Sequence, residues 1–206
     1  MWKPAPPKHR EFKKTVYKQI AETSSFIYQI GDSPILRQPS AEVPEAYIRT
    51  EEFKKKLRYL KRCLKRYREI TEMGVGIAAP QVGIAERFVI IYAPTIQERM
   101  LVMINPEVTR FSEKLLKYPE MCMSATPCIA PVIRPDWVEV QYVDESGHPQ
   151  EWQLKADTPA GRKLNRIVQH EIDHVNGIIN IDRVAAKDII FESDPDFYTT
   201  ASFTDV

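Results

Sequence analysis

The stretch TPAGRKLNRIVQHEIDHVNGII, residues 158–179, contains the pattern His170-Glu171-x-x-His174. Four residues advance a helix by about 6 Å and return nearly to the same face, so both imidazoles can reach one metal ion. Glu171 follows the first histidine and can accept a proton from a water molecule on that metal. The stretch therefore predicts a metal-binding helix, against the plainer alternative of two ordinary surface histidines.

A catalytic metal needs a third protein ligand, and the sequence offers three alternatives. One class of zinc peptidases uses a later histidine, but that position is Asn180 here. A second class uses a downstream glutamate, for which Glu192 is the candidate. The third alternative is Cys122, in YPEMCMSATPC at 118–128, since a thiolate can ligate a metal. Spacing alone does not choose among them.

Composition is that of a globular protein able to build its own core. The chain has 206 residues, 43% of them hydrophobic and 28% charged, with a formal net charge of +1. This balance gives no electrostatic reason to expect a nucleic-acid or membrane partner. No apolar run approaches the roughly 20 residues that a membrane span needs. The three cysteines do not form a disulfide pattern, which favours a reducing compartment.

The pattern along the chain predicts one α+β domain. The metal-binding helix has Thr158 as its expected N-cap and Pro159 at its first position, with Gly177 suited to end it. The other expected elements are an extended start at 1–10, a short helix within 11–30, an extended segment at 35–36, a helix over 45–72, and strands at 87–93, 100–106, 137–144 and 151–156, the last two joined by a turn at 146–148.

The helix expected over 45–72 has one apolar face and one basic face. Its basic residues are Lys54, Lys55, Arg58, Lys61, Arg62, Lys65 and Arg66. Such a face can bind RNA or a ribosome, although a solvated surface is the commoner explanation. The first twenty residues are also basic, which is compatible with organelle targeting or with a solvated arm.

Three blocks, in this order and spacing, resemble the peptide deformylase family: GVGIAAPQ at 74–81, EMCMS at 120–124 and QHEIDHVNG at 169–177. GDSPILR at 31–37 and IDR at 181–183 add to the resemblance, which spans about 28–185. The resemblance implies an α+β fold, with antiparallel sheets packed around a central metal-binding helix. It also implies an N-terminal arm at 1–27, a catalytic domain at 28–185 and a C-terminal tail at 186–206.

The resemblance implies a metal centre and a reaction. Cys122, His170 and His174 would bind one divalent metal ion, with iron(II) expected and zinc, nickel or cobalt as substitutes. The reaction would be removal of the N-formyl group from the initiator methionine of nascent polypeptides, releasing formate. A metal-bound water would attack, with Glu171 as general base.

Further residues would bind the substrate. Gln81 and the backbone N–H of Met123 would donate to the formyl oxygen. Gly76 would line the peptide, and Arg166 would lie at the rim of the side-chain pocket. Met121 stands where the family has glycine, so we expect it to point away from the metal and to narrow the groove.

The segment after Ser124 and the residue Asp173 lead to two further expectations near the site. The segment after Ser124 has prolines at 127, 131 and 135 where the family usually has glycines, which predicts a stiffer loop. Asp173, between the two histidines, would either orient a histidine ring or have a structural role at the helix surface, solvated or in a salt bridge with Arg166 or Arg183.

The implied partner is an N-formyl-methionyl peptide, with ribosome association on the basic helix face as an option. No nucleic-acid or membrane role is expected, and the protein would be a monomer or homodimer. The N-terminal arm favours a mitochondrion or plastid, with the bacterial cytoplasm as the alternative. Two other functions remain open from the residues: a deformylase-like metal-binding protein with lost or altered activity, and a metallopeptidase with Glu192 as ligand.

Overall fold

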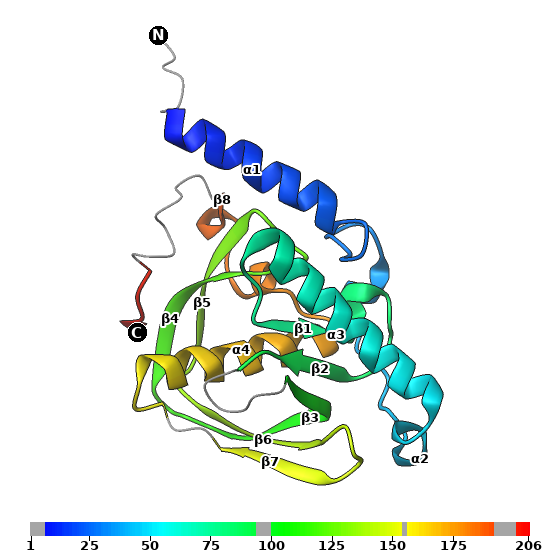
Figure 1. The fold of residues 1–206 in the computed structure, drawn as a ribbon. Helices are drawn as coiled ribbons and strands as arrows, with labels where there is room; N and C mark the ends of the chain where they lie inside the picture. Colours follow the sequence, from blue (N-terminus) through cyan, green and yellow to red (C-terminus); the bar gives the residue numbers. More distant parts are fainter. Residues whose placement is uncertain (1–6, 94–99, 154–155, 192–200) are drawn as a thin grey trace.

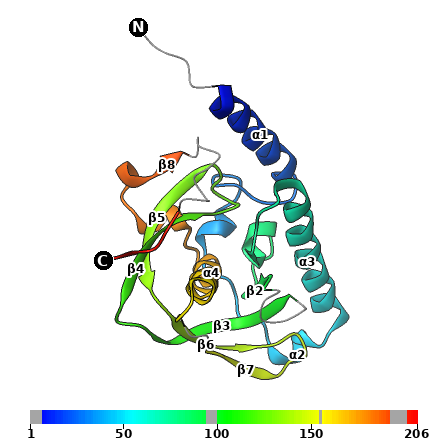
Figure 2. The ribbon, with the colours of Figure 1, turned by 60° about the vertical axis from the view of Figure 1, so that its left-hand side comes forward.

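The protein is described by a computed structural model that covers residues 7–93, 100–153, 156–191 and 201–206. Two antiparallel sheets enclose the helix α4 (Pro159–Val175). Figure 1 shows α4 crossing the middle of the molecule, and in Figure 2 it is seen nearly end-on between the two sheets. The expected α+β fold with a central helix is confirmed. Among the described residues, no helix is both long and apolar enough to cross a membrane.

The larger sheet has five strands in the order β1-β2-β3-β6-β7. Their bounds are Gly76–Ala78, Phe88–Ile91, Leu101–Phe111, Val138–Val143 and Pro149–Gln153. The hairpin predicted between β6 and β7 is present, and its turn contains Gly147 at a φ of +83°. Glycine occupies such left-handed conformations at little cost, which is why it suits this turn.

The sheet is buried on both faces, and the sequence of β2 shows why. All four residues of this strand are buried. Phe88 and Ile90 lie in the apolar cluster that includes the inner face of α3, whereas Val89 and Ile91 lie in the cluster that includes α4. Because successive side chains of a strand point to opposite faces, a continuous apolar run can pack against a helix on each side.

The smaller sheet has four strands in the order β8-β5-β4-β9. Their bounds are Ile190–Phe191, Cys128–Pro135, Leu115–Met121 and Thr204–Asp205. The proline-rich segment after Ser124 was expected to be a loop, but most of it forms β5. Pro131 lies opposite Pro119 in the register, so the two residues without an N–H donor share one position of the ladder.

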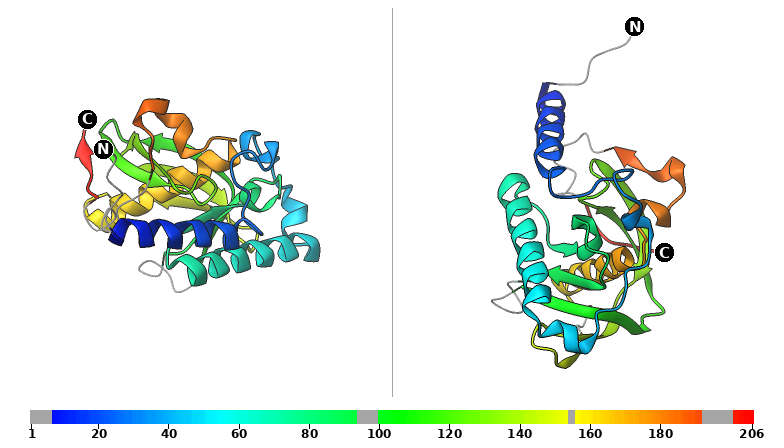
Figure 3. Two further views of the ribbon diagram at one scale, coloured as in Figure 1. Left: turned by 90° about the horizontal axis from the view of Figure 1, so that it is seen from above. Right: turned by 90° about the vertical axis from the view of Figure 1, so that its right-hand side faces the viewer.

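The helix predicted over 45–72 is two helices, α2 (Glu45–Ile48) and α3 (Glu51–Thr71). The chain turns at Thr50, whose side-chain oxygen accepts a hydrogen bond from Phe53 N at 3.2 Å. A threonine in an extended conformation satisfies a free N–H at a helix start, so it begins a second helix and ends the continuous one that periodicity predicts. Figure 3 shows α3 along one side of the molecule.

Two expectations for the N-terminal region are wrong. The helix α1 spans Pro7–Thr23, so it begins inside the segment 1–10 that was expected to be extended; residues 1–6 of that segment lie outside the described residues. Proline is tolerated in the first turn of a helix, where its missing N–H costs nothing. The segment 35–36, expected to be extended, lies within the 3-10 helix η1 (Pro34–Arg37), which is capped by Ser33, whose Oγ accepts from Ile35 N at 3.3 Å.

Candidate metal centre and active site

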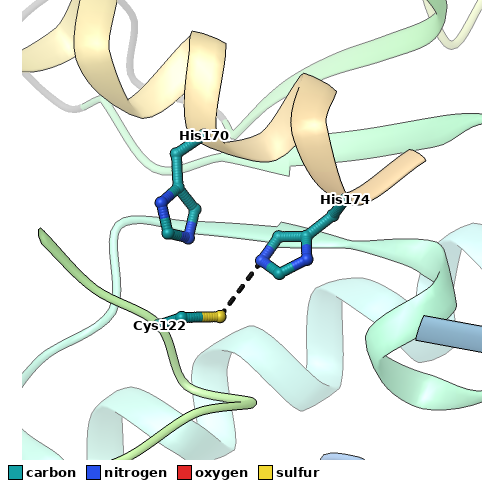
Figure 4. A group of neighbouring side chains, drawn as sticks. All are labelled: Cys122, His170 and His174. Atoms are coloured by element: carbon teal, nitrogen blue, oxygen red, sulfur yellow. Dashed lines mark hydrogen bonds between the residues drawn. The ribbon is translucent and has the colours of Figure 1, made fainter. Parts of the chain in front are cut away.

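Cys122, His170 and His174 converge on one point. Their ligand atoms all lie within 4.8 Å of one another, and Cys122 Sγ lies 3.1 Å from His174 Nε2. Figure 4 shows the two imidazoles descending from α4 towards the thiol. Of the two other ligands considered, Asn180 is buried and donates to the carbonyl of Glu120, and Glu192 lies outside the described residues.

The positions of these side chains follow from local structure. The helix α4 begins at its predicted cap, where Thr158 Oγ1 accepts from Gly161 N at 3.0 Å. Its regular turn puts both histidines on one face, which Figure 4 shows pointing towards Cys122. Along β4, alternation sends the buried side chain of Glu120 towards α4, where it contacts His170, and sends Met121 to the opposite face.

Glu120 fixes the orientation of His170. His170 Nδ1 lies 3.0 Å from Glu120 Oε2. An ionised carboxylate only accepts hydrogen bonds, so Nδ1 carries a proton and Nε2 faces the cluster, where a metal ion would take the place of a second proton. Burial alone raises the pKa of Glu120, but Arg134 and the hydrogen bond from His170 hold that pKa far below its usual value. Glu120 therefore stays charged.

Arg134 makes this buried charge tolerable. Its Nε and Nη2 donate to the two oxygens of Glu120 at 2.7 and 2.9 Å, and its Nη1 donates to Asp173 Oδ2 at 2.7 Å. All three side chains are buried. Sequence reasoning missed the roles of Glu120 and Arg134. Glu120 had a signal, since it lies in the EMCMS block, whereas nothing in the sequence singles out Arg134.

Asp173 forms the salt bridge that was one of its two expected roles. It binds Arg134 and Arg183. No hydrogen bond joins Asp173 to either histidine ring in the described part of the chain. The buried His174 Nδ1 likewise has no hydrogen-bond partner among the described residues.

Glu171 is buried beside β1 at the metal centre. Burial raises its pKa to about 7, which is suited to taking and returning a proton near neutral pH. One carboxylate oxygen, Oε2, has no hydrogen-bond partner among the described residues. Gly76 makes room for this side chain, because a Cβ at residue 76 would lie 2.3 Å from Glu171 Oε1.

Gln81 is held beside Cys122 by both ends of its amide. Its Oε1 accepts from Ala78 N at 2.9 Å, and its Nε2 donates to Ser124 Oγ at 3.0 Å while lying 3.7 Å from Cys122 Sγ. The amide N–H groups therefore point towards the metal centre. Met123 follows Cys122, and its side chain is buried in the core cluster under α3.

A groove of about 210 Å³ opens at the metal centre. It is bounded by segments 73–76 and 118–121 and by the α4 residues Lys163, Arg166, Ile167 and His170. The structure thus brings Gly76, Gln81, Met121, Arg166 and Glu171 to one groove. Arg166 is more buried than its expected place at the rim implies, and it is anchored to Glu120 Oε1 at 2.6 Å and to Leu116 O at 2.6 Å.

The donor set fits a divalent metal ion. Tetrahedral bonds of about 2.0–2.3 Å put neighbouring ligand atoms roughly 3.3–3.8 Å apart. Here Cys122 Sγ and His174 Nε2 are 3.1 Å apart, and all three ligand atoms lie within 4.8 Å of one another, so small side-chain shifts would bring them to this spacing. Burial lowers the pKa of His174 well below its ordinary value, so that ring is neutral, as a metal ligand must be. Burial acts the same way on His170, yet Cys122 and Glu120 raise its pKa well above normal. Cys122 and Glu120 thus favour a positive charge between the three ligand atoms, which a divalent metal ion would supply.

Comparisons with known proteins agree with this site. The sequence profile of the polypeptide deformylase family matches residues 25–189. A peptide deformylase from Prochlorococcus marinus (strain MIT 9312) is 34% identical over 179 residues, which cover 85% of this chain and 81% of the relative.

Solved structures show the same fold. The peptide deformylase of Synechococcus elongatus in complex with actinonin is 35% identical, with a TM-score of 0.64, covering 78% of this chain and 79% of that one. The Met-Ala-Ser-bound class I type b peptide deformylase of Acinetobacter baumannii is 29% identical, with a TM-score of 0.63, covering 77% and 96%. From its fold, its metal-ligand cluster and these similarities, the chain belongs to the peptide deformylase family.

Proposed function

We propose that this chain removes the N-formyl group from the initiator methionine of nascent polypeptides through one divalent metal ion held by Cys122, His170 and His174. The observation that carries this proposal is the convergence of these three side chains beside the buried carboxylate of Glu171. When bound, the metal supplies a Lewis acid that lowers the pKa of a coordinated water. Iron(II) is the proposed ion, with zinc, nickel or cobalt as substitutes.

Glu171 is the proposed general base and then the general acid. Its raised pKa, about 7, lets it accept a proton from the attacking water and return it to the leaving amine. Its Oε2, which has no hydrogen-bond partner in the described part of the chain, is the atom that would hold this proton. The lack of a Cβ at Gly76 allows the carboxylate to reach this position.

Gln81 and the backbone N–H of Met123 are the proposed donors to the formyl oxygen. Gln81 is suited to this role because its amide is fixed before substrate arrives, so no reorganisation is needed during the reaction. Removing one such donor typically costs about two to three orders of magnitude in rate.

Gly76, Met121 and Arg166 are the proposed substrate-binding residues, because each lines the groove. Arg166 also stabilises the site, since it neutralises Glu120. Substitution of Arg166 would therefore affect both folding and binding, and an activity loss alone would not separate the two.

Metal-reconstituted enzyme under anaerobic conditions, assayed for formate release from formyl-Met-Ala-Ser, tests the function. We expect turnover by the wild type. Glu171→Gln should lose most activity and keep stoichiometric metal, whereas Cys122→Ser should lose the metal as well. Absence of formate from a wild-type protein with one bound metal ion would refute the proposal and leave a metal-binding protein.

The setting of the reaction follows from its substrate. Formylated nascent chains are made in bacteria and in organelles, and the cyanobacterial relatives favour the bacterial cytoplasm or a plastid over a mitochondrion. Ribosome association remains a proposal. It is supported by the exposed basic residues of α3, among them Lys55, Arg58 and Lys65.

A further inference from the structure

Two features of this chain lie outside the pattern of its family, and they meet in the structure. The helix α1 ends at Thr23, before residue 25, where the family match begins, and Met121 stands where the resemblance leads us to expect glycine. A small cavity of about 20 Å³ separates them. The α1 residues that line it are Phe12, Val16, Gln19, Ile20 and Thr23.

The helix α1 is anchored over this cavity. Val16 and Thr23 are buried, and Gln19 Nε2 donates to Ile70 O of α3 at 3.2 Å. The outer face of α1 is exposed, with Tyr17 62% accessible to solvent. Figure 2 shows α1 continuing beyond one end of α3, above the tips of β4 and β5. One face of α1 therefore covers the region behind Met121.

Three residues form the partition between this cavity and the substrate groove. Tyr67, Met73 and Met121 line both. Met73 comes from the segment leading into β1 and Met121 from the end of β4, so the two thioethers belong to opposite sides of the groove. Tyr67 is buried and packs tightly here, because a Cβ on Gly74 would lie 2.8 Å from its ring. The partition is apolar and adaptable, since methionine side chains repack easily.

The position of the metal ligands fixes the direction in which a peptide substrate runs along the groove. The formyl group is at the N-terminus of the peptide and must reach the metal ligands, so the rest of the peptide extends away from Cys122 between segments 73–76 and 118–121. Along β4, Leu116 and Lys117 pair with β9, and the ring of Tyr118 packs against Phe203 at 4.5 Å between ring centroids. Within the described residues, the edge from Pro119 to Met121 has no strand paired to it on this side and is available to a peptide.

A peptide extended along this edge alternates its side chains between two faces. One face of the groove is formed by Arg166 and Ile167 of α4, and the other by the partition with Met121. If the methionine side chain lies on the α4 face, beside Ile167, the side chain of the next residue points to the partition.

We propose that Tyr67, Met73 and Met121, backed by α1, form a subsite for the residue that follows formyl-methionine, and that this subsite favours an apolar side chain. This inference rests on the proposed function of the same site. Each methylene moved from water into apolar contact is worth about a fourfold gain in affinity. Leucine has three more carbons than alanine, which would give about sixtyfold if all three were fully buried. The groove is open on one side and buries them only in part, so we expect leucine to be preferred over alanine by roughly tenfold in kcat/KM, and glutamate to be disfavoured.

The test compares kcat/KM for formyl-Met-Leu-Ser, formyl-Met-Ala-Ser and formyl-Met-Glu-Ser. Met121→Gly should reduce the Leu/Ala ratio to about 2 or below. Val16→Asp puts a charge on the covered face of α1 and should also lower the ratio, because α1 no longer supports the partition. Tyr17→Asp is the matched control, with the same charge on the exposed face of the same helix, and should leave the ratio unchanged.

Each result decides the proposal. A wild-type ratio near 1, or a ratio that Met121→Gly does not change, overturns it. Equal effects of Val16→Asp and Tyr17→Asp overturn the role of α1. If Val16→Asp does not fold, Phe12→Ala replaces it, because it only shortens a side chain at the same cavity.

Failure of the proposed function gives a different signature. In that case no formate appears with any of the three peptides. The subsite is then tested by the Kd values of the unformylated peptides Met-Leu-Ser and Met-Ala-Ser, whose ratio needs no turnover. A tighter Kd for the leucine peptide, lost in Met121→Gly, supports the subsite, and equal Kd values overturn it.

Discussion

Substitution Gly76→Ala should disable the enzyme by displacing its general base. The added Cβ would lie 2.3 Å from Oε1, 2.6 Å from Cδ and 2.7 Å from Cγ of Glu171. Ordinary contact begins near 3.4 Å, so the carboxylate must retreat by about 1 Å. A misplacement of about 1 Å at a reacting group can cost about a hundredfold in rate. We therefore expect kcat/KM to fall about a hundredfold, with one metal ion still bound.

The same clash should also lower the free energy of unfolding. Overpacking of a buried site typically costs about 1–3 kcal/mol, measurable by urea denaturation. When Glu171 is replaced by alanine, the clash is absent. Adding Gly76→Ala to Glu171→Ala should therefore leave the free energy of unfolding nearly unchanged and should not lower the residual rate further. This double-mutant cycle isolates the contact between the two side chains.

A matched control separates the clash from general effects of losing a glycine. Gly31 lies at a φ of +95°, and a Cβ at this position would have no neighbour within 4 Å. Gly31→Ala should therefore cost stability through backbone strain but leave activity intact. If Gly76→Ala keeps wild-type kcat/KM, the argument that Gly76 exists to admit Glu171 is wrong. If the effects of Gly76→Ala and Glu171→Ala on stability are additive, residue 76 and Glu171 are not in contact.

Three further outcomes follow from the neighbours of the metal ligands. Glu120→Gln should weaken metal affinity about 10–100-fold, measured by competition with a chelator, because the amide holds the His170 ring less well; unchanged affinity would contradict the orienting role. Arg134→Met should cost up to about 3–5 kcal/mol in urea unfolding, because it removes the cation that two buried carboxylates share and leaves Glu120 with Arg166 alone and Asp173 with Arg183 alone. A loss below about 1 kcal/mol would argue against this role of Arg134. Gln81→Ala should lower kcat about 10²–10³-fold at unchanged metal content, whereas a loss of metal instead would make Gln81 a structural support of Cys122.

The sequence by itself determined those helices and strands whose type and ends are set by their own residues. The helix carrying His170 and His174 could be predicted because its cap, its period and its end are all encoded within about twenty residues. The strand β2 could be predicted for the same reason, since an apolar run flanked by polar residues needs no distant partner to be identified. Periodicity did not predict the break between α2 and α3, because the spacing of the apolar residues does not show the cap at Thr50. The strand β5 was predicted to be a loop, because its prolines are compatible with a strand only when the partner strand is known.

The tertiary structure decided which distant side chains meet. Cys122 and His174 are separated by 52 positions, and Glu120 and His170 by 50. No local rule fixes such pairs, because they depend on how the smaller sheet packs against α4. The neutralisation of Glu120 and Asp173 by one buried arginine, and the meeting of α1 with Met121, are of the same kind. A sequence specifies periodicity within an element through backbone geometry, whereas contacts between elements arise only when apolar faces are buried against one another.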